Sequence, residues 1–161
     1  MLKEVAPTLI DYQIRPALLS DLVAVCQIET DSFDQPYPGV LMDKLLREHS
    51  GSFFVASDRS GRLVGYCVAT VRGGSAHLIS AAVLRHQRRK GIAAGLLETL
   101  IKYLIGQRVK ELWLEVKLSN QEAIALYTKL GFAQLSVISN YYSDGAAALR
   151  MRLSLKVKPV E

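Results

Sequence analysis

Apolar positions along this chain change between the spacing of strands and the spacing of helices. Short apolar runs predict seven strands, at residues 12–15, 53–56, 63–69, 77–83, 111–116, 132–138 and 147–155. Helical spacing predicts four helices, at residues 19–33, 41–50, 92–106 and 119–130. Because strands and helices alternate through the second half of the chain, we expect an α/β fold with right-handed crossovers.

Local features place three of these helices more closely. In the first helix, apolar side chains recur at roughly helical spacing, at Leu22, Val23, Cys26 and Phe33. The third helix has a stripe predicted to face the core, formed by Ile92, Leu96, Leu100 and Leu104. The fourth begins with a capping-box pattern of Ser119 and Glu122, and Gly131 follows its last turn.

Length and composition fit one soluble globular domain over residues 1–161. No apolar run reaches the roughly 18 to 20 residues that a membrane span needs, so we expect no membrane partner. Cys26 and Cys67 lie far apart in apolar surroundings, which indicates two small buried side chains in a reducing compartment. Residues 1–4 contain no apolar signal core, so a cytoplasmic location is expected.

The net charge is +5, and the basic residues cluster only between Arg85 and Lys90. One local cluster suits a phosphate-bearing small molecule better than a nucleic acid. The segment between the central strand and the third helix reads Arg88-Arg89-Lys90-Gly91-Ile92-Ala93. Glycine lets the backbone approach a ligand, and the first N–H groups of a helix favour an anion. The segment therefore predicts an anion cradle that suits a polyphosphate, and a solvated turn is the alternative.

The cradle and a later segment resemble two motifs of the GNAT family of N-acetyltransferases. Residues 88–93 resemble the family's pyrophosphate loop, Gln/Arg-x-x-Gly-x-Gly/Ala. Residues 114–132 resemble the signature that follows it, roughly Leu-x-Val-x-x-x-Asn-x-x-Ala-x-x-Leu-Tyr-x-x-x-Gly-Phe. The resemblance implies the GNAT fold, a mixed central sheet of about seven strands flanked by about four helices.

Within the family, the chain is most similar to protein N-terminal acetyltransferases, both the bacterial ribosomal-protein-alanine enzymes and the archaeal and eukaryotic catalytic subunits. The similarity lies at residues 77–83, 114–116 and 141–145. It implies transfer of acetyl from acetyl coenzyme A to a free protein N-terminus, by direct attack on the thioester and without a metal. The expected acceptor is a protein or peptide N-terminus, with no nucleic acid. Whether the chain forms a homodimer or uses an auxiliary subunit stays open.

The resemblance also implies which residues bind the coenzyme. The cradle would hold the pyrophosphate, and the central strand would face the pantetheine arm and supply an N–H to the developing oxyanion near Ala82 or Val83. Asn120 matches a coenzyme-contacting asparagine, although helix capping explains it equally well. The expected set is Ala81, Ala82, Val83, Arg88, Arg89, Lys90, Gly91, Ile92, Ala93, Asn120 and Tyr127.

Three residues match the family's catalytic groups. His77 and Glu115 match a pair that serves as the base in archaeal enzymes, acting through water, and Tyr127 matches the proton donor to the departing thiolate. An α-amino group has a pKa of about 7.7 to 8.0, so an N-terminal acceptor needs only a modest base. The structural alternatives are a core histidine, an ion pair at a strand end and a core tyrosine, respectively.

The acceptor is expected to contact aromatic residues of two loops, namely Phe33, Tyr37, Tyr141 and Tyr142. Pro36 and Pro38 predict that Tyr37 lies in a loop. Archaeal and eukaryotic relatives usually carry Pro-Glu where this chain has Asp34-Gln35, and Asp-Gly-Glu-Asp-Ala where it has residues 144–148. The carboxylates missing from these two segments leave the acceptor open between a protein N-terminus and a small amine or lysine side chain. A non-catalytic coenzyme-binding module is the third alternative.

Overall fold

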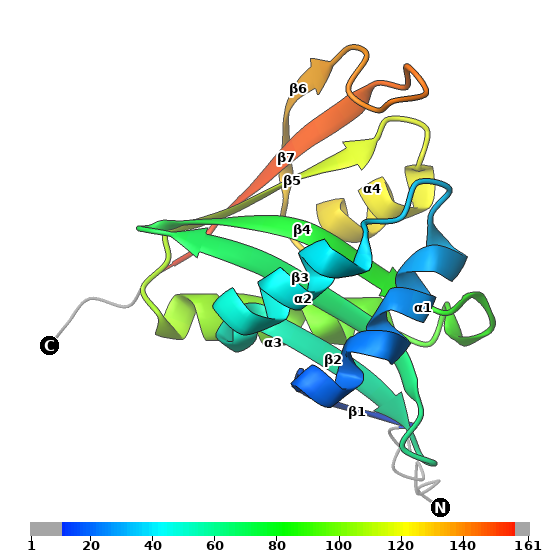
Figure 1. Cartoon of the computed structure of the whole chain (residues 1–161). Helices are drawn as coiled ribbons and strands as arrows, with labels where there is room; N and C mark the ends of the chain where they lie inside the picture. Colours follow the sequence, from blue (N-terminus) through cyan, green and yellow to red (C-terminus); the bar gives the residue numbers. More distant parts are fainter. Residues whose placement is uncertain (1–10, 157–161) are drawn as a thin grey trace, which may run out of the picture.

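The computed structural model describes residues 11–156, so residues 1–4 lie outside the described part. Within this part, seven strands form one mixed sheet in the order β1-β2-β3-β4-β5-β7-β6 (Figure 1). They are β1 (Tyr12–Pro16), β2 (Phe53–Asp58), β3 (Leu63–Arg72), β4 (Ser75–Val83), β5 (Glu111–Lys117), β6 (Ala133–Ile138) and β7 (Ala148–Ser154). The four α-helices are α1 (Leu22–Ser32), α2 (Gly39–Glu48), α3 (Ile92–Gly106) and α4 (Gln121–Lys129). The expected α/β fold is confirmed.

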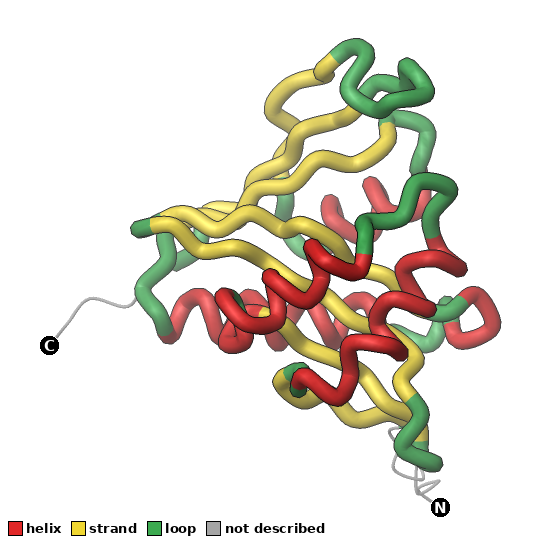
Figure 2. Tube along the Cα trace, in the orientation of Figure 1, coloured by secondary structure: helices red, strands yellow, loops and turns green. Residues whose placement is uncertain are grey.

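Helices cover both faces of the sheet centre (Figure 2). On β3, the hydroxyl of Tyr66 donates to the carboxylate of Glu29 in α1, whereas Cys67 Sγ donates to Leu96 O in α3 at 3.6 Å. Since successive strand residues point to opposite faces, α1 and α3 lie on opposite sides of the sheet. Residues 63–69 are accordingly all buried, as expected for a strand covered on both faces.

The predicted stripe of α3 forms part of the core. Ile92, Leu96, Leu100 and Leu104 are each at most 3% exposed, which confirms the prediction. Cys67 is fully buried as predicted, whereas Cys26 is only partly buried because it lies at the margin of the core.

Strands β4 and β5 pair for only a short distance and then diverge. Their parallel pairing runs from Ser75↔Glu111 to His77↔Trp113, although both strands continue beyond it. Opposite β3, the register shifts so that Val68 faces Ser80 and Ala69 faces Leu78, which leaves Ile79 as an extra residue. A bulge of this kind bends a strand. Figure 1 shows the two strands spreading apart toward their carboxyl ends.

The buried face of helix α1 differs from the face that its apolar residues predict. Val23 is 70% exposed, and the buried residues are Val25, Ile28 and Glu29. These three have the i, i+3, i+4 spacing of one helix face, but one of them is charged. The apolar pattern is therefore incomplete without the glutamate.

The capping box predicted at Ser119 is wrong by one residue. Asn120 is the N-cap of α4, and its side-chain oxygen accepts from the Ala123 N–H at 3.1 Å. The N–H of Asn120 donates to Lys117 O at 2.9 Å, and this turn carries the chain one residue further before the helix begins. Gly131 follows the helix with a φ of 103°, as predicted.

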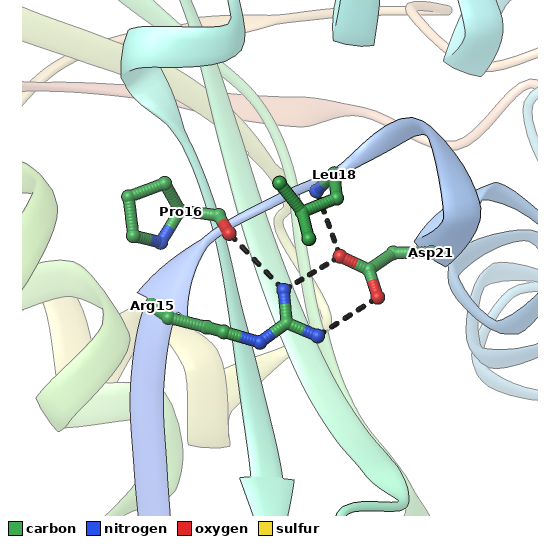
Figure 3. A network of polar contacts seen from close by, with 4 residues as sticks. All are labelled: Arg15, Pro16, Leu18 and Asp21. Carbon is green, nitrogen blue, oxygen red and sulfur yellow. Dashed lines mark hydrogen bonds and ion pairs between the residues drawn. The ribbon is translucent and has the colours of Figure 1, made fainter.

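An ion pair joins β1 to the start of α1 (Figure 3). Arg15 Nη1 and Nη2 donate to the two carboxylate oxygens of Asp21 at 2.7 and 2.9 Å, and the Leu18 N–H donates to the same carboxylate at 2.7 Å. The Arg15 guanidinium lowers the pKa of Asp21 below its ordinary value. Asp21 directly precedes α1, so it also places a negative charge at the positive end of the helix dipole.

Candidate active site

Two cavities lie side by side where β4 and β5 diverge. Cavity A has a volume of about 480 Å³ and extends toward the start of α3. Cavity B has a volume of about 460 Å³ and extends toward the loops that follow α1 and β6. Seven residues line both, namely Phe33, Asp34, Ala81, Lys117, Asn120, Ala123 and Tyr127. A molecule in cavity A can therefore meet a molecule in cavity B at these shared residues.

The predicted cradle borders cavity A as a tightly turned loop. The backbone is left-handed at Arg89, with a φ of 63°, and at Gly91, with a φ of 80°. Gly91 is the N-cap of α3, and within the described residues Gly95 provides the first helical hydrogen bond, to Gly91 O at 2.9 Å. The N–H groups before it at the start of α3 remain available. Together with the helix dipole they favour a bound anion.

Five of the six cradle residues line cavity A, namely Arg88, Arg89, Gly91, Ile92 and Ala93. Lys90 does not, because it is exposed and its Nζ donates to Gln87 Oε1 at 2.9 Å. Arg88 Nε donates to Val83 O at 2.9 Å and so ties the cradle to the end of β4. Among the described residues, Arg89 has no ion pair or side-chain hydrogen bond, which leaves its charge free for a ligand.

Beyond the point where its pairing with β5 ends, the main chain of β4 has N–H and C=O groups that point away from β3. The Leu84 N–H donates to Val64 O at 2.8 Å, on the β3 side. Because backbone groups alternate in direction along an antiparallel strand, those of Ala82 also face β3, while those of Ala81 and Val83 face the other way. Of the two N–H groups predicted for an oxyanion, that of Val83 therefore has the suitable direction.

Tyr127 and Asn120 lie at the junction of the two cavities. The Asn120 oxygen is used in capping α4, so the capping alternative holds for that atom. The Tyr127 ring packs edge-on against Phe132, with 5.6 Å between ring centroids. Burial raises the pKa of Tyr127 to about 12, so its hydroxyl stays protonated at neutral pH. It can therefore donate a hydrogen bond at the junction.

His77 and Glu115 are brought into direct contact in cavity B. His77 Nε2 lies 2.7 Å from Glu115 Oε2, and Arg150 Nη2 donates to Glu115 Oε1 at 2.9 Å. The His77 ring stacks on Trp113 with 3.7 Å between centroids and 4° between planes. The Glu115 side chain is only 6% exposed and His77 24%. The two residues thus form a fixed pair in which the histidine is the more accessible member.

The four aromatic residues expected to contact the acceptor line cavity B, namely Phe33, Tyr37, Tyr141 and Tyr142, and Phe33 also lines cavity A. Tyr141 packs edge-on against Tyr142, with 4.9 Å between centroids. Burial raises the pKa of Tyr142 to about 12. The two loops that carry these residues also meet, because the Ser143 hydroxyl donates to Gln35 Oε1.

Three residues of the site were not found from the sequence. Glu29 and Lys117 line cavity B, and Arg150 holds Glu115. Glu29 could have been found as a charged residue within the buried face of α1. Arg150 carries no local signal, because only the pairing of β5 with β7 brings it opposite Glu115. Within residues 11–156, no group of three or more His, Cys, Asp and Glu side chains is placed to hold a metal ion.

The fold agrees with those of known proteins. Residues 22–132 match the acetyltransferase (GNAT) family. A protein of Sulfurisphaera tokodaii named N-alpha-acetyltransferase is 34% identical over 158 residues, which cover 90% of this chain and 94% of that protein. The structure of Ard1 from Thermoplasma volcanium has a TM-score of 0.87 and 30% identity, covering 91% of this chain and 99% of that one.

A bacterial relative is similar over nearly the same length. The ribosomal-protein-S18-alanine N-acetyltransferase of Escherichia coli has a TM-score of 0.82 and 30% identity, covering 92% of this chain and 96% of that one. The chain belongs to the acetyltransferase (GNAT) family, which confirms the class expected from its two motifs. No helix within residues 11–156 has both the length and the apolar character needed to cross a membrane.

Proposed function

We propose that this chain transfers acetyl from acetyl coenzyme A to the free amino terminus of a protein. The observation that carries the proposal is the junction of the two cavities at Tyr127, with the basic cradle on one side and the His77–Glu115 pair on the other. Such a junction lets a thioester from cavity A face an amine from cavity B. Relatives named N-alpha-acetyltransferase, 32% to 36% identical to this chain, support the same acceptor.

The residues around cavity A fit a coenzyme with a pyrophosphate and an amide-containing arm. The available N–H groups at the start of α3 and the free Arg89 guanidinium suit the pyrophosphate. The outward-facing backbone of Ala81 and Val83 suits the amides of the arm, and the Val83 N–H suits the developing oxyanion. The coenzyme supplies an activated acetyl thioester.

We assign His77 as the base and Glu115 as the group that orients it. Both Glu115 oxygens are engaged, one by Arg150 and one by His77, so this carboxylate is poorly placed to take another proton. A carboxylate on Nε2 favours the tautomer with hydrogen on that atom, which leaves Nδ1 as the acceptor. Within the described residues, Nδ1 has no hydrogen bond. It can therefore accept the ammonium proton, directly or through one water.

Tyr127 serves the leaving thiolate as a hydrogen-bond donor. A thiol has a pKa of about 8.5, whereas the pKa of Tyr127 is raised to about 12 by burial. Full proton transfer from this tyrosine to the thiolate is therefore uphill. The hydroxyl instead donates a hydrogen bond that stabilises the negative charge on the sulfur as the thiolate leaves. This role does not require complete transfer of the proton.

The acceptor class rests on the form of cavity B. Aromatic side chains from two loops line it, and the contact between Ser143 and Gln35 joins the loops. This arrangement suits an extended peptide end whose first residues are held by aromatic contacts. A small amine or a lysine side chain is the second candidate, since Gln35 and Ala146 stand where a carboxylate would mark an N-terminal acceptor.

The test is acetyl coenzyme A turnover with peptides that differ in their first residue. Spermidine and an N-terminally blocked peptide carrying lysine serve as comparison acceptors. Turnover confined to free N-termini supports the proposal and identifies the preferred first residue. Turnover of the blocked peptide or of spermidine at an equal rate would instead support a small amine or a lysine side chain as the acceptor. Coenzyme binding with no turnover of any acceptor would indicate a non-catalytic module.

A further inference from the structure

Glu29 is a buried carboxylate that lies beneath the wall of cavity B and is not used in the chemistry above. It is 1% exposed and lines the cavity. Three groups donate to it. Ser80 Oγ donates to Oε2 at 3.0 Å, the Tyr66 hydroxyl donates to the same oxygen, and the Tyr37 N–H donates to Oε1 at 3.0 Å.

No ion pair within the described residues includes Glu29. A buried carboxylate without a cation is unfavourable unless its oxygens are hydrogen-bonded, and here three donors meet that need. Two of the donors, Tyr66 and Ser80, are fixed in β3 and β4, and their hydroxyls are 2.9 Å apart. Oxygen Oε2 is thereby attached to the rigid centre of the sheet. Oxygen Oε1 is left for the loop.

The loop has few main-chain donors, and within residues 11–156 its one main-chain acceptor contact is Pro38 O with the N–H groups of Leu41 and Met42 at the start of α2. Residues 34–38 follow α1 and precede α2, and Pro36 and Pro38 have no N–H to donate. Among the described residues, the Tyr37 N–H is the one main-chain donor of this segment that makes a hydrogen bond, and its acceptor is Glu29. The carboxylate thus bridges the sheet and the loop.

The geometry points to Glu29 as a positioning residue that anchors residues 34–38 to β3 and β4 and so sets how tightly cavity B binds its acceptor. This inference rests on the proposed function, because it takes cavity B as the acceptor site. Tyr37 lines cavity B, and its main-chain N–H is the anchored atom. Release of that N–H would let the aromatic wall move, while the cradle and the start of α3, which line cavity A and make no hydrogen bond to Glu29, would keep their positions.

The test separates the reach of the side chain from its charge. Glu29→Gln keeps the length and one acceptor oxygen but removes the charge. Glu29→Asp keeps the charge but is one methylene too short to span from Tyr66 and Ser80 to the Tyr37 N–H. Glu29→Met keeps the length and removes both. Asp31→Asn, at an exposed position of the same helix, removes one charge without any such contact and is the matched control.

Two measurements are made on each variant. The first is the pair of KM values, for the acceptor peptide and for acetyl coenzyme A. The second is the hydrogen-exchange rate of the Tyr37 amide, with the melting temperature recorded to identify unfolded variants. Loss of one buried hydrogen bond corresponds to about tenfold, so we expect Glu29→Asp and Glu29→Met to raise the peptide KM about tenfold. In both, Tyr37 exchange should be faster and the coenzyme KM unchanged.

Glu29→Gln and the Asp31→Asn control should resemble wild type in both measurements. If Glu29→Met and Glu29→Asp leave the peptide KM and the Tyr37 exchange rate at wild-type values, the inference is wrong. If Glu29→Gln raises the KM as much as Glu29→Met does, the charge matters and the anchor does not, which also overturns it. If Glu29→Met fails to fold, Glu29→Asp and Glu29→Gln still decide between these outcomes. A wild type that turns over no peptide contradicts the proposed function instead, and the exchange data still test the anchor.

Discussion

His77 Nε2 and Glu115 Oε2 are 2.7 Å apart, although 38 residues separate them in the chain. The imidazole lies flat on Trp113, and the carboxylate is held from its other side by Arg150. The pair is thus held on three sides by strands β4, β5 and β7. A proton acceptor in this position has one orientation and one free nitrogen.

Replacement of either member of the pair should lower turnover and spare coenzyme binding. Neither residue lines cavity A, so Glu115→Gln and His77→Ala should leave the coenzyme Kd nearly unchanged. We expect His77→Ala to lower kcat by about 10² or more, the usual contribution of a general base, and Glu115→Gln to lower it less. Stopped-flow or steady-state turnover across about pH 6 to 9 measures both. Wild-type activity of Glu115→Gln over that range would contradict the assignment.

Arg150 should matter for turnover although it lines neither cavity. In Arg150→Gln, one Glu115 oxygen loses its guanidinium partner, and we expect kcat to fall about tenfold through loss of orientation. Arg152→Gln is the matched control, since Arg152 is exposed, lies two residues further along β7 and reaches a partly exposed Glu111 at 3.8 Å. Exposed pairs contribute little, so the control should stay within about twofold of wild type. Equal effects of the two variants would show that general charge, not this contact, is responsible.

Arg89 should contribute to coenzyme binding and Lys90 should not. Arg89→Ala removes the one cradle arginine whose charge has no protein partner among the described residues, and we expect the coenzyme KM to rise about tenfold with kcat little changed. Lys90→Ala, at a position outside both cavities, is the comparison. Alanine and arginine are similarly disfavoured at a φ of 63°, so the loop conformation is not the variable. The difference in coenzyme KM between wild type and Arg89→Ala should become smaller as salt is added, because salt screens the charge of Arg89.

Tyr127→Phe should lower kcat but leave the shape of the pH–rate profile unchanged. Its pKa is raised to about 12 by burial, so the hydroxyl is protonated throughout the range in which the enzyme is assayed. We expect kcat to fall about tenfold, because a hydrogen bond to the thiolate is lost. The phenyl ring keeps its packing on Phe132, and the melting temperature should be unchanged. If the pH–rate profile of the wild type has a limb below about pH 10 that is absent from that of Tyr127→Phe, the hydroxyl ionises during turnover.

The Arg15–Asp21 pair should make stability depend on pH (Figure 3). Folding lowers the pKa of Asp21, so its contribution is fully present above the ordinary value of 3.8 and is lost as the pH falls through the lower folded value. Asp21→Asn should cost about 1 kcal/mol at neutral pH, reduced because Arg15 is partly exposed. Urea unfolding at several pH values measures this. If the free energy of unfolding differed between Asp21→Asn and wild type by the same amount in acid as at neutral pH, the prediction would be wrong.

Much of the fold could be predicted because its causes are local. The stripe from Ile92 to Leu104 has one periodicity, and that periodicity alone requires a helix with one buried face. The cradle could be predicted for the same reason, since Gly91 and the following helix start are adjacent in the chain. The exact cap of α4 could not, because Ser119 and Asn120 are both good caps and a turn at Lys117 decides between them.

The sequence by itself determined the α/β class, the basic loop that precedes α3 and the residue types available for chemistry. These follow from spacing between neighbours, and spacing is written directly in the chain. Only the tertiary structure decided which groups meet: that His77 contacts Glu115, that Arg150 completes the pair, and that Glu29 is buried against Tyr66. Each of these contacts joins different elements of the fold. Their geometry depends on sheet order and on the divergence of β4 from β5, which no local pattern specifies.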